Sequence, residues 1–495
     1  MASRDASSPI RMNPTGPVGQ LRSVALLKGA QVVAGILFTV LVPRLMGPNL
    51  YGQFAVIISV FTLWRMSCTI GGRYIFGRFI PEYSSRGDSD RIREVFMHVL
   101  GARAIVVLVA APLLFFFLRR VLPMASTTTL VASTLAFVVT MLAGPMYNVY
   151  FGLNRLGMSM TNDPIGRFLL LGLLVLIGGT SNLEMASVAL LLANCCVLLV
   201  GLVLARGLIT FDRRVFDLKS IVEHVSFGLV VYSANLLLRV PWRLGESALA
   251  LAKTDSAEIA FFSVAVSATV AFTRLLGSAT TLLIPSMSLR QASGDYEGRD
   301  RSMGIALRYL EVAACLFVPF VVAAGPKLVS VLLGDSYLGV VPHMYVLSIA
   351  VLGIPVLRTA VAFSVVVGRV GLNVQLGLVA VVVFGVAALA LIPKYGAIGA
   401  SVAVVASIMS SSIIGAMQIR KTGVLSEARV ATQSMVAVAS GAILLLGSFS
   451  LITAIGAAAA YVGISLALKV IQPRELQQLL RESGLAFWAR KAVSP

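Results

Sequence analysis

Long apolar runs separated by short polar segments recur along the chain from about residue 24 to about residue 471. A helix needs about 20 mostly apolar residues to cross a bilayer, and these runs are continuous where a transmembrane barrel would alternate. The pattern therefore predicts an all-α polytopic membrane protein with about 14 transmembrane helices and both termini on one side. The predicted spans cover residues 24–43, 53–72, 98–118, 128–150, 165–180, 186–205, 227–250, 259–283, 306–325, 343–364, 372–392, 399–419, 432–449 and 454–471.

Composition and charge refine this picture. The 495 residues are 58% hydrophobic and 12% charged, with a net charge of +19. If the N-terminus is cytoplasmic, most of the Lys and Arg outside the spans fall in cytoplasmic segments, as the positive-inside rule requires. The basic surplus is therefore topological, so both termini are expected in the cytoplasm and nucleic acid is not expected as a partner. The first run is followed by Pro43 and Arg44, which is not a signal-peptide cleavage site.

One predicted span carries charges near its middle. The stretch SFGLVVYSANLLLRVPWRLGESALA contains Arg239, Arg243 and Glu246, spaced four and three residues apart, with Pro241 between the arginines. This spacing places all three on one face of a helix. An Arg at a helix centre in lipid costs roughly 2.5–3.5 kcal/mol, so it is stable only facing a water-filled or protein-lined space. The stretch predicts a cationic cavity; pairing of Arg243 with Glu246 for helix packing is the alternative.

The second half of the chain repeats the first. LYGQFAVIIS resembles EIAFFSVAVS, FIPEYSSRGD resembles LIPSMSLRQASGD, and YFGLNRLG has a counterpart in VVGRVG, all in the same order. Matching elements start on the same side of the membrane, six spans apart, which indicates a parallel repeat about an axis along the membrane normal. Two pseudo-symmetric six-helix lobes plus two C-terminal helices follow.

These boundaries divide the chain into six parts. They are a disordered cytoplasmic N-terminus (1–21), an N-lobe of six spans (22–206), a cytoplasmic linker (207–226), a C-lobe of six spans (227–420), two further spans (430–471) and a cytoplasmic amphipathic tail (472–495). The basic tail is expected to lie on the anionic membrane surface. Docking of a polysaccharide polymerase or synthesis enzyme is the alternative for the tail.

Five motifs carry a family resemblance: RLMGPNLYGQF, RFIPEYSSRGD, AEIAFFSVAVS, LLGDSYLGVVP and IPKYGAIGAS. In this order they resemble the polysaccharide transporter family, the Wzx-type flippases of the multidrug/oligosaccharidyl-lipid/polysaccharide (MOP) superfamily, over the first twelve spans. The motifs look structural, because glycines and prolines such as Gly47, Pro48, Gly52, Gly396 and Gly399 suit tight turns and close helix approach.

The resemblance implies a MATE-like fold and a function. Two lobes would surround a central cavity and move a polyprenyl-pyrophosphate-linked oligosaccharide to the outer leaflet of the bacterial inner membrane, for O-antigen, lipopolysaccharide or exopolysaccharide synthesis. By position in the spans, the substrate-binding candidates are Arg65, Arg239, Arg243, Arg274 and Arg358. Guanidinium groups bind phosphate oxygens bidentately.

Other titratable residues in or near the spans receive lesser roles. Glu246 and Glu311 are candidates for ion coupling, with simple pairing to Arg as the alternative. Arg103 is expected to snorkel to the cytoplasmic interface. The three histidines, at the span ends, are expected to be interfacial rather than proton relays: His98, His224 and His343.

Other function classes fit less well. The chain has no GxxxxGK[ST] loop and no His, Cys, Asp and Glu cluster with metal-ligand spacing, so no enzyme activity, catalytic residue, cofactor or metal is expected. A polysaccharide polymerase or ligase is expected to have a large outer loop, and the short loops between the predicted spans therefore disfavour this class. A MATE-type cation or drug exporter should carry acidic rather than basic residues in its spans. A lipid-linked peptidoglycan precursor flippase shares the anionic substrate and stays open.

Overall fold

The computed structural model describes residues 17–209, 218–369 and 371–420, and all regular structure in these ranges is helical. The predicted spans 432–449 and 454–471 and the predicted tail lie outside them. The helices are α1 (Pro17–Cys68), α2 (Gly72–Ser85), α3 (Ser89–Val121), α4 (Thr127–Gly152), α5 (Leu156–Ser159), α6 (Asn162–Leu176), α7 (Leu183–Ala205), α8 (Leu218–Leu237), α9 (Pro241–Leu251), α10 (Ser256–Ala292), α11 (Tyr296–Leu333), the 3-10 helix η2 (Asp335–Tyr337), α12 (Val340–Val366) and α13 (Gly371–Ile419).

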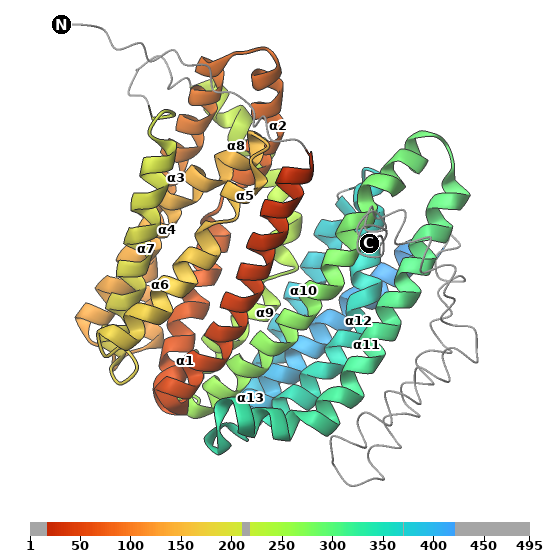
Figure 1. Ribbon diagram of the computed structural model, residues 1–495. Coiled ribbons are helices and arrows are strands. Elements are labelled where there is room, and N and C mark those ends of the chain that lie inside the picture. The colour runs from red at the N-terminus through yellow and green to blue at the C-terminus, as the bar shows by residue number, and fades with distance from the viewer. Residues whose placement is uncertain (1–16, 210–217, 370, 421–495) are drawn as a thin grey trace, which may run out of the picture. The chain divides into compact units, whose positions relative to one another are not determined.

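Two long helices each contain two predicted spans joined at a glycine. α1 is interrupted at Gly47 (φ 73°, ψ 165°) and α13 at Gly396 (φ 53°, ψ −131°). Both conformations have positive φ, which glycine adopts without the steric cost of a Cβ. Figure 1 shows α1 turning back on itself at the lower end of the view. The predicted turn role of these two glycines is confirmed.

Two other motif glycines mark close backbone approach. A Cβ on Gly52 would overlap the carbonyl oxygen of Ser256, and one on Gly399 would overlap the carbonyl oxygen of Leu391. Any larger residue would push these segments apart. The prediction that these motifs are structural is therefore confirmed at both positions.

The internal repeat is visible in the backbone. Gly87 (φ 70°) and Gly294 (φ 79°) occupy equivalent turns in the two halves. The residues that follow them, Asp88 and Asp295, cap α3 and α11, each accepting a hydrogen bond from the backbone N–H three residues on, at 3.0 and 2.9 Å. A glycine with positive φ favours the end of one helix, and an Asp after it caps the start of the next. This arrangement occurs once in each half of the chain.

The helices carry apolar surface outward, as a bilayer requires. Eight helices in the described part of the chain are long and apolar enough to cross a membrane. Along α3 and α13, exposed large apolar side chains recur every three or four residues and form a stripe on one face. These side chains are Ile105, Leu108, Val109, Leu113 and Phe116 on α3, and Leu378, Val382, Val386 and Leu389 on α13. The chain is thus a multi-pass membrane protein.

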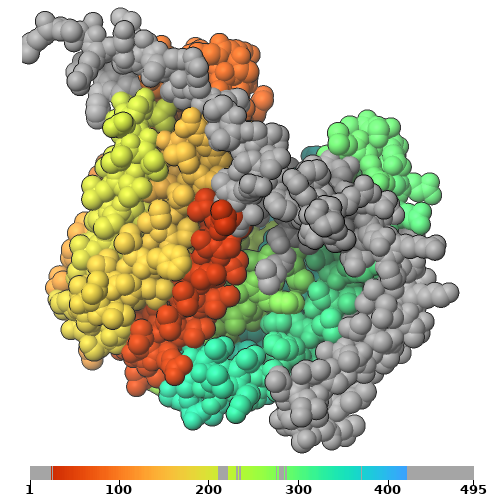
Figure 2. Space-filling view, viewed as in Figure 1, coloured from red at the N-terminus to blue at the C-terminus, as the bar shows by residue number. Residues whose placement is uncertain are grey.

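The chain forms two compact units. Unit 1 runs to Leu236 and includes Asp255–Ala260; unit 2 contains Leu237–Thr254 and everything from Phe261 onward. In unit 1, α4 packs against α3 and α7, and α1 packs against α6; Figure 2 shows α1, in red, lying along the yellow residues of α6. In unit 2, α12 packs against both α11 and α13. The chain first passes from unit 1 to unit 2 at Leu237, the last residue of α8.

Candidate functional site

The predicted span 227–250 is broken in its middle. α8 ends at Leu237, three residues are outside the helices, and α9 starts at Pro241. Proline has no backbone N–H to continue the hydrogen bonds of the preceding turn, so a new helix starts there. Arg239 lies exposed in the break. The prediction that Arg239 shares one helical face with Arg243 and Glu246 is therefore wrong, because only the last two belong to α9.

Arg239 has a basic neighbour from another part of unit 2. The charges of Arg239 and Arg358 repel each other, although Arg358 lies far along the chain on α12. The Arg358 guanidinium lies beside Gly277 of α10, where a Cβ would be 3.3 Å from both Cζ and Nε. Arg274 is three residues before Gly277 and exposed, so it lies on the same face of α10. Arg239 and Arg358 therefore lie near each other in unit 2, and Arg274 is one turn before the glycine of α10 that Arg358 contacts.

This group of Arg239, Arg274 and Arg358, here called the unit 2 arginines, is accessible. Arg358 is exposed although the residues on either side of it, Leu357 and Thr359, are buried. No ion pair among the described residues involves Arg239 or Arg358. Exposed like charges in the middle of a membrane-spanning unit are stable when they face water or an anion. The group presents guanidinium donors that match phosphate oxygens in geometry and charge.

Unit 1 contains a second basic region. Arg65 is exposed in the last turn of α1, while Arg103 of α3 is only 3% exposed. The charges of these two residues act on each other, and Tyr232 of α8 is near enough to interact with Arg103. The expected snorkelling of Arg103 to the interface is wrong.

The burial of Arg103 has a local cause. Pro145 of α4 has no N–H to donate to the carbonyl of Met141, so that carbonyl loses its helical partner. Arg103 Nη1 donates to the Met141 carbonyl oxygen at 3.2 Å. Gly144 makes room for the guanidinium, since a Cβ there would overlap Nη1. The sequence signal was the Gly144-Pro145 pair opposite an intramembrane arginine.

The two candidate coupling carboxylates are both buried. Glu246 is fully buried and its Oε1 accepts a hydrogen bond from Ser263 Oγ of α10 at 3.3 Å. Glu311 of α11 is 5% exposed, and its Oε2 has no hydrogen-bond partner in the described part of the chain. Neither carboxylate belongs to the exposed surface of the unit 2 arginines. Their role in ion coupling stays a prediction.

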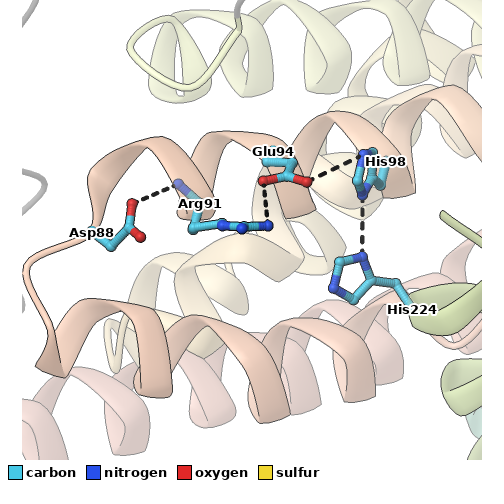
Figure 3. A network of polar contacts seen from close by, with 5 residues as sticks. All are labelled: Asp88, Arg91, Glu94, His98 and His224. Carbon is cyan, nitrogen blue, oxygen red and sulfur yellow. Dashed lines mark hydrogen bonds and ion pairs between the residues drawn. The ribbon is translucent and has the colours of Figure 1, made fainter. Parts of the chain in front are cut away.

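The three histidines are buried among helices, and their expected place at the membrane interface stays a prediction. His98, His224 and His343 are 0%, 5% and 2% exposed. His343 Nδ1 lies 3.0 Å from Ser401 Oγ, and His98 Nδ1 lies 3.1 Å from His224 Nδ1, joining α3 to α8 (Figure 3). Sequence position placed them at span ends, but neighbouring helices cover these ends.

Comparison with known proteins adds to the geometry. The family model of polysaccharide biosynthesis proteins matches residues 21–291. The lipid II flippase MurJ in an inward closed conformation has a similar structure, with a TM-score of 0.72 and 10% identity over 90% of this chain and 99% of that one. An inward-facing multidrug resistance MATE family transporter of the MOP superfamily gives a TM-score of 0.56 and 13% identity over 85% and 99%. Among curated proteins no sequence matches. At such identities the likeness shows a shared fold.

Proposed function

Because that model covers more than half of its 495 residues, the chain belongs to the family of polysaccharide biosynthesis proteins, and we propose that it is a lipid-linked oligosaccharide flippase. Its substrate is an oligosaccharide linked to a polyprenyl pyrophosphate. It carries this substrate from the cytoplasmic to the outer leaflet of a bacterial inner membrane by alternating access, with both termini cytoplasmic and without enzymatic chemistry. The unit 2 arginines are its candidate substrate contacts, and Arg243 of unit 2 and Arg65 of unit 1 are each kept as a separate candidate.

The observation that carries this proposal is the proximity of Arg239 and Arg358, which are exposed and mutually repelling. A pyrophosphate group needs counter-charge once it leaves the headgroup region of the membrane. Two guanidinium forks supply that charge and bind phosphate oxygens bidentately. An anionic headgroup also relieves the repulsion between the two side chains.

The membrane potential supplies a driving force for this substrate. Moving one elementary charge across the membrane is worth about 2.3 kcal/mol per 100 mV. Outward movement of a negatively charged headgroup is therefore downhill when the inside is negative. Coupling to an ion at Glu246 or Glu311 would add to this driving force. Imposing a membrane potential and an ion gradient in separate experiments distinguishes transport driven by the potential from transport driven by the ion.

The direct test is leaflet transfer in proteoliposomes that contain the full chain and a labelled undecaprenyl-pyrophosphate oligosaccharide. Each hydrogen bond to a charged group is worth about 1.5–3 kcal/mol, so the double variant Arg239→Ala/Arg358→Ala should lose transfer by about 100-fold or more. The Lys/Lys double variant should retain part of the activity. Arg120→Ala, which removes an exposed arginine at the far end of α3, is the matched control. Unchanged transfer by a folded double variant refutes the site.

The likeness to MurJ favours one second candidate, a flippase for a lipid-linked peptidoglycan precursor. The same vesicles decide between the two when both lipid substrates are offered in competition. Preferential transfer of the peptidoglycan precursor would replace our proposal. Export of cationic dyes instead of either lipid would indicate a MATE-type exporter, which the basic site disfavours.

A further inference from the structure

The buried histidine pair of unit 1 has no part in substrate binding as proposed. His98 comes from the third turn of α3 and His224 from the second turn of α8. Their Nδ1 atoms are 3.1 Å apart and their ring centroids 5.3 Å apart. Figure 3 shows the two rings pointing toward each other from different helices. The pair is therefore a direct polar link between α3 and α8.

The chemistry of this link limits how many protons it holds. A hydrogen bond between two Nδ1 atoms needs one N–H donor and one bare lone pair. The link survives with two neutral rings, or with one ring protonated. With both rings protonated, two donors and two positive charges face each other and the bond is lost. The pair accepts one added proton and breaks on the second.

Charged and aromatic groups of α3 and α2 contact the two rings. His98 Nε2 lies 4.0 Å from Glu94 Oε1, whose other oxygen accepts a hydrogen bond from Arg91 Nη1 at 3.1 Å. His224 lies three residues before the predicted span 227–250, and the Phe79 ring of α2 packs edge-on against it with the ring centroids 4.5 Å apart.

The second proton is disfavoured at neutral pH. Burial lowers the pKa of His224, the charges of His98 and Arg91 lower it further, and only the adjacent Glu223 acts in the opposite direction. From α2, Tyr83 faces the same group of charges, and burial raises the pKa of its phenol so that it stays neutral. The link is therefore closed at neutral pH and opens only in acid.

The link between the two histidines holds α8, the helix that ends just before the break at Arg239. α8 belongs to unit 1 up to Leu236, and the chain enters unit 2 at the last residue of this helix, Leu237. One turn after His224, the backbone of Gly228 lies against that of Gly71, with no side chain between them. That glycine contact does not depend on protonation. The histidine pair is thus the titratable attachment of the first turns of α8.

We propose that the hydrogen bond between His98 and His224 is a pH-sensitive contact, here called the latch. It holds the start of α8 against α3 at neutral pH and breaks on acidification. Release frees the first turns of α8, upstream of the helix break. The inference rests on the geometry of unit 1 alone and does not require the proposed substrate. Its test uses no transport measurement, so its failure is separate from failure of the flippase proposal.

Hydrogen exchange of the full-length protein in nanodiscs tests the latch. If His224 titrates only in the released state, with an ordinary pKa of about 6.5, the released population rises about tenfold between about pH 7.5 and about pH 5.5. Exchange of residues 218–227, corrected for intrinsic rates, should rise by that factor in the wild type. His224→Gln keeps a hydrogen-bonding side chain without a titratable ring and should show no rise.

Two further variants sharpen the result. His98→Gln removes the second donor and the charge that face His224, so it should weaken the same response, while burial of His224 maintains part of it. His343→Gln removes a different buried histidine, in unit 2, and should leave the α8 response intact. A wild-type protein whose α8 exchange is independent of pH overturns the latch. An acid response that persists in His224→Gln also overturns it.

Discussion

The contact between Arg103 and the carbonyl opposite Pro145 gives a quantitative prediction. Pro145 leaves the Met141 carbonyl without its helical donor, and Arg103 Nη1 replaces that donor at 3.2 Å. The perturbation is Arg103→Met, which keeps the length of the side chain and removes its donors. In the wild-type background it leaves a buried carbonyl unsatisfied.

The expected magnitude depends on residue 145. An unsatisfied buried polar group costs about 1–3 kcal/mol. Removing a buried charge returns part of this, because replacing buried ionic groups with apolar ones is often neutral or stabilising. In a Pro145→Ala background the new N–H at position 145 donates to Met141, so Arg103→Met no longer leaves an orphan. The two substitutions should therefore couple by about 1–2 kcal/mol, more than the 0.3–0.5 kcal/mol scatter of independent sites.

The assay is equilibrium unfolding in mild detergent of the wild type, the two single variants and the double variant. We expect Arg103→Met to be destabilising alone and nearly neutral, or stabilising, with Pro145→Ala. Strictly additive effects would show that Arg103 does not satisfy the carbonyl. A lower stability of the double variant than additivity predicts would refute the reasoning outright.

Two further predictions concern glycines. Gly52→Ala should destabilise the protein by about 1–3 kcal/mol or more, because the new Cβ overlaps the Ser256 carbonyl. The control is Gly29→Ala, whose Cβ meets nothing within 4 Å and which should be neutral or stabilising by up to about 1 kcal/mol. Equal melting temperatures of these two variants would contradict the prediction. Gly277→Ala brings a methyl group to 3.3 Å from the Arg358 guanidinium, so it should lower transfer severalfold with little change in thermal stability; a stability loss with normal transfer would mean that the contact serves packing only.

The sequence by itself determined most of the helical framework. Continuous apolar runs predicted the spans, because a bilayer requires them to be apolar over a fixed length. Gly47 and Gly396 marked the two turns inside α1 and α13, because a positive φ favours glycine. The repeated Gly-Asp turn at 87–88 and 294–295 marked equivalent helix starts. These are local constraints, and each is written in a few adjacent residues.

Only the tertiary structure decided where the charged side chains go. Arg103 and His224 are both buried by helices that lie far away in the sequence, and no local pattern distinguishes a buried face from a lipid-facing one when both are apolar. The proximity of Arg239 and Arg358 likewise depends on how the segment between α8 and α9 packs near α12. In a membrane helix, an apolar sequence shows that the segment lies in the bilayer, but it does not show which other helix each face packs against. The location of each charged side chain is therefore set by contacts between helices that are far apart in the sequence, and local sequence patterns do not show these contacts.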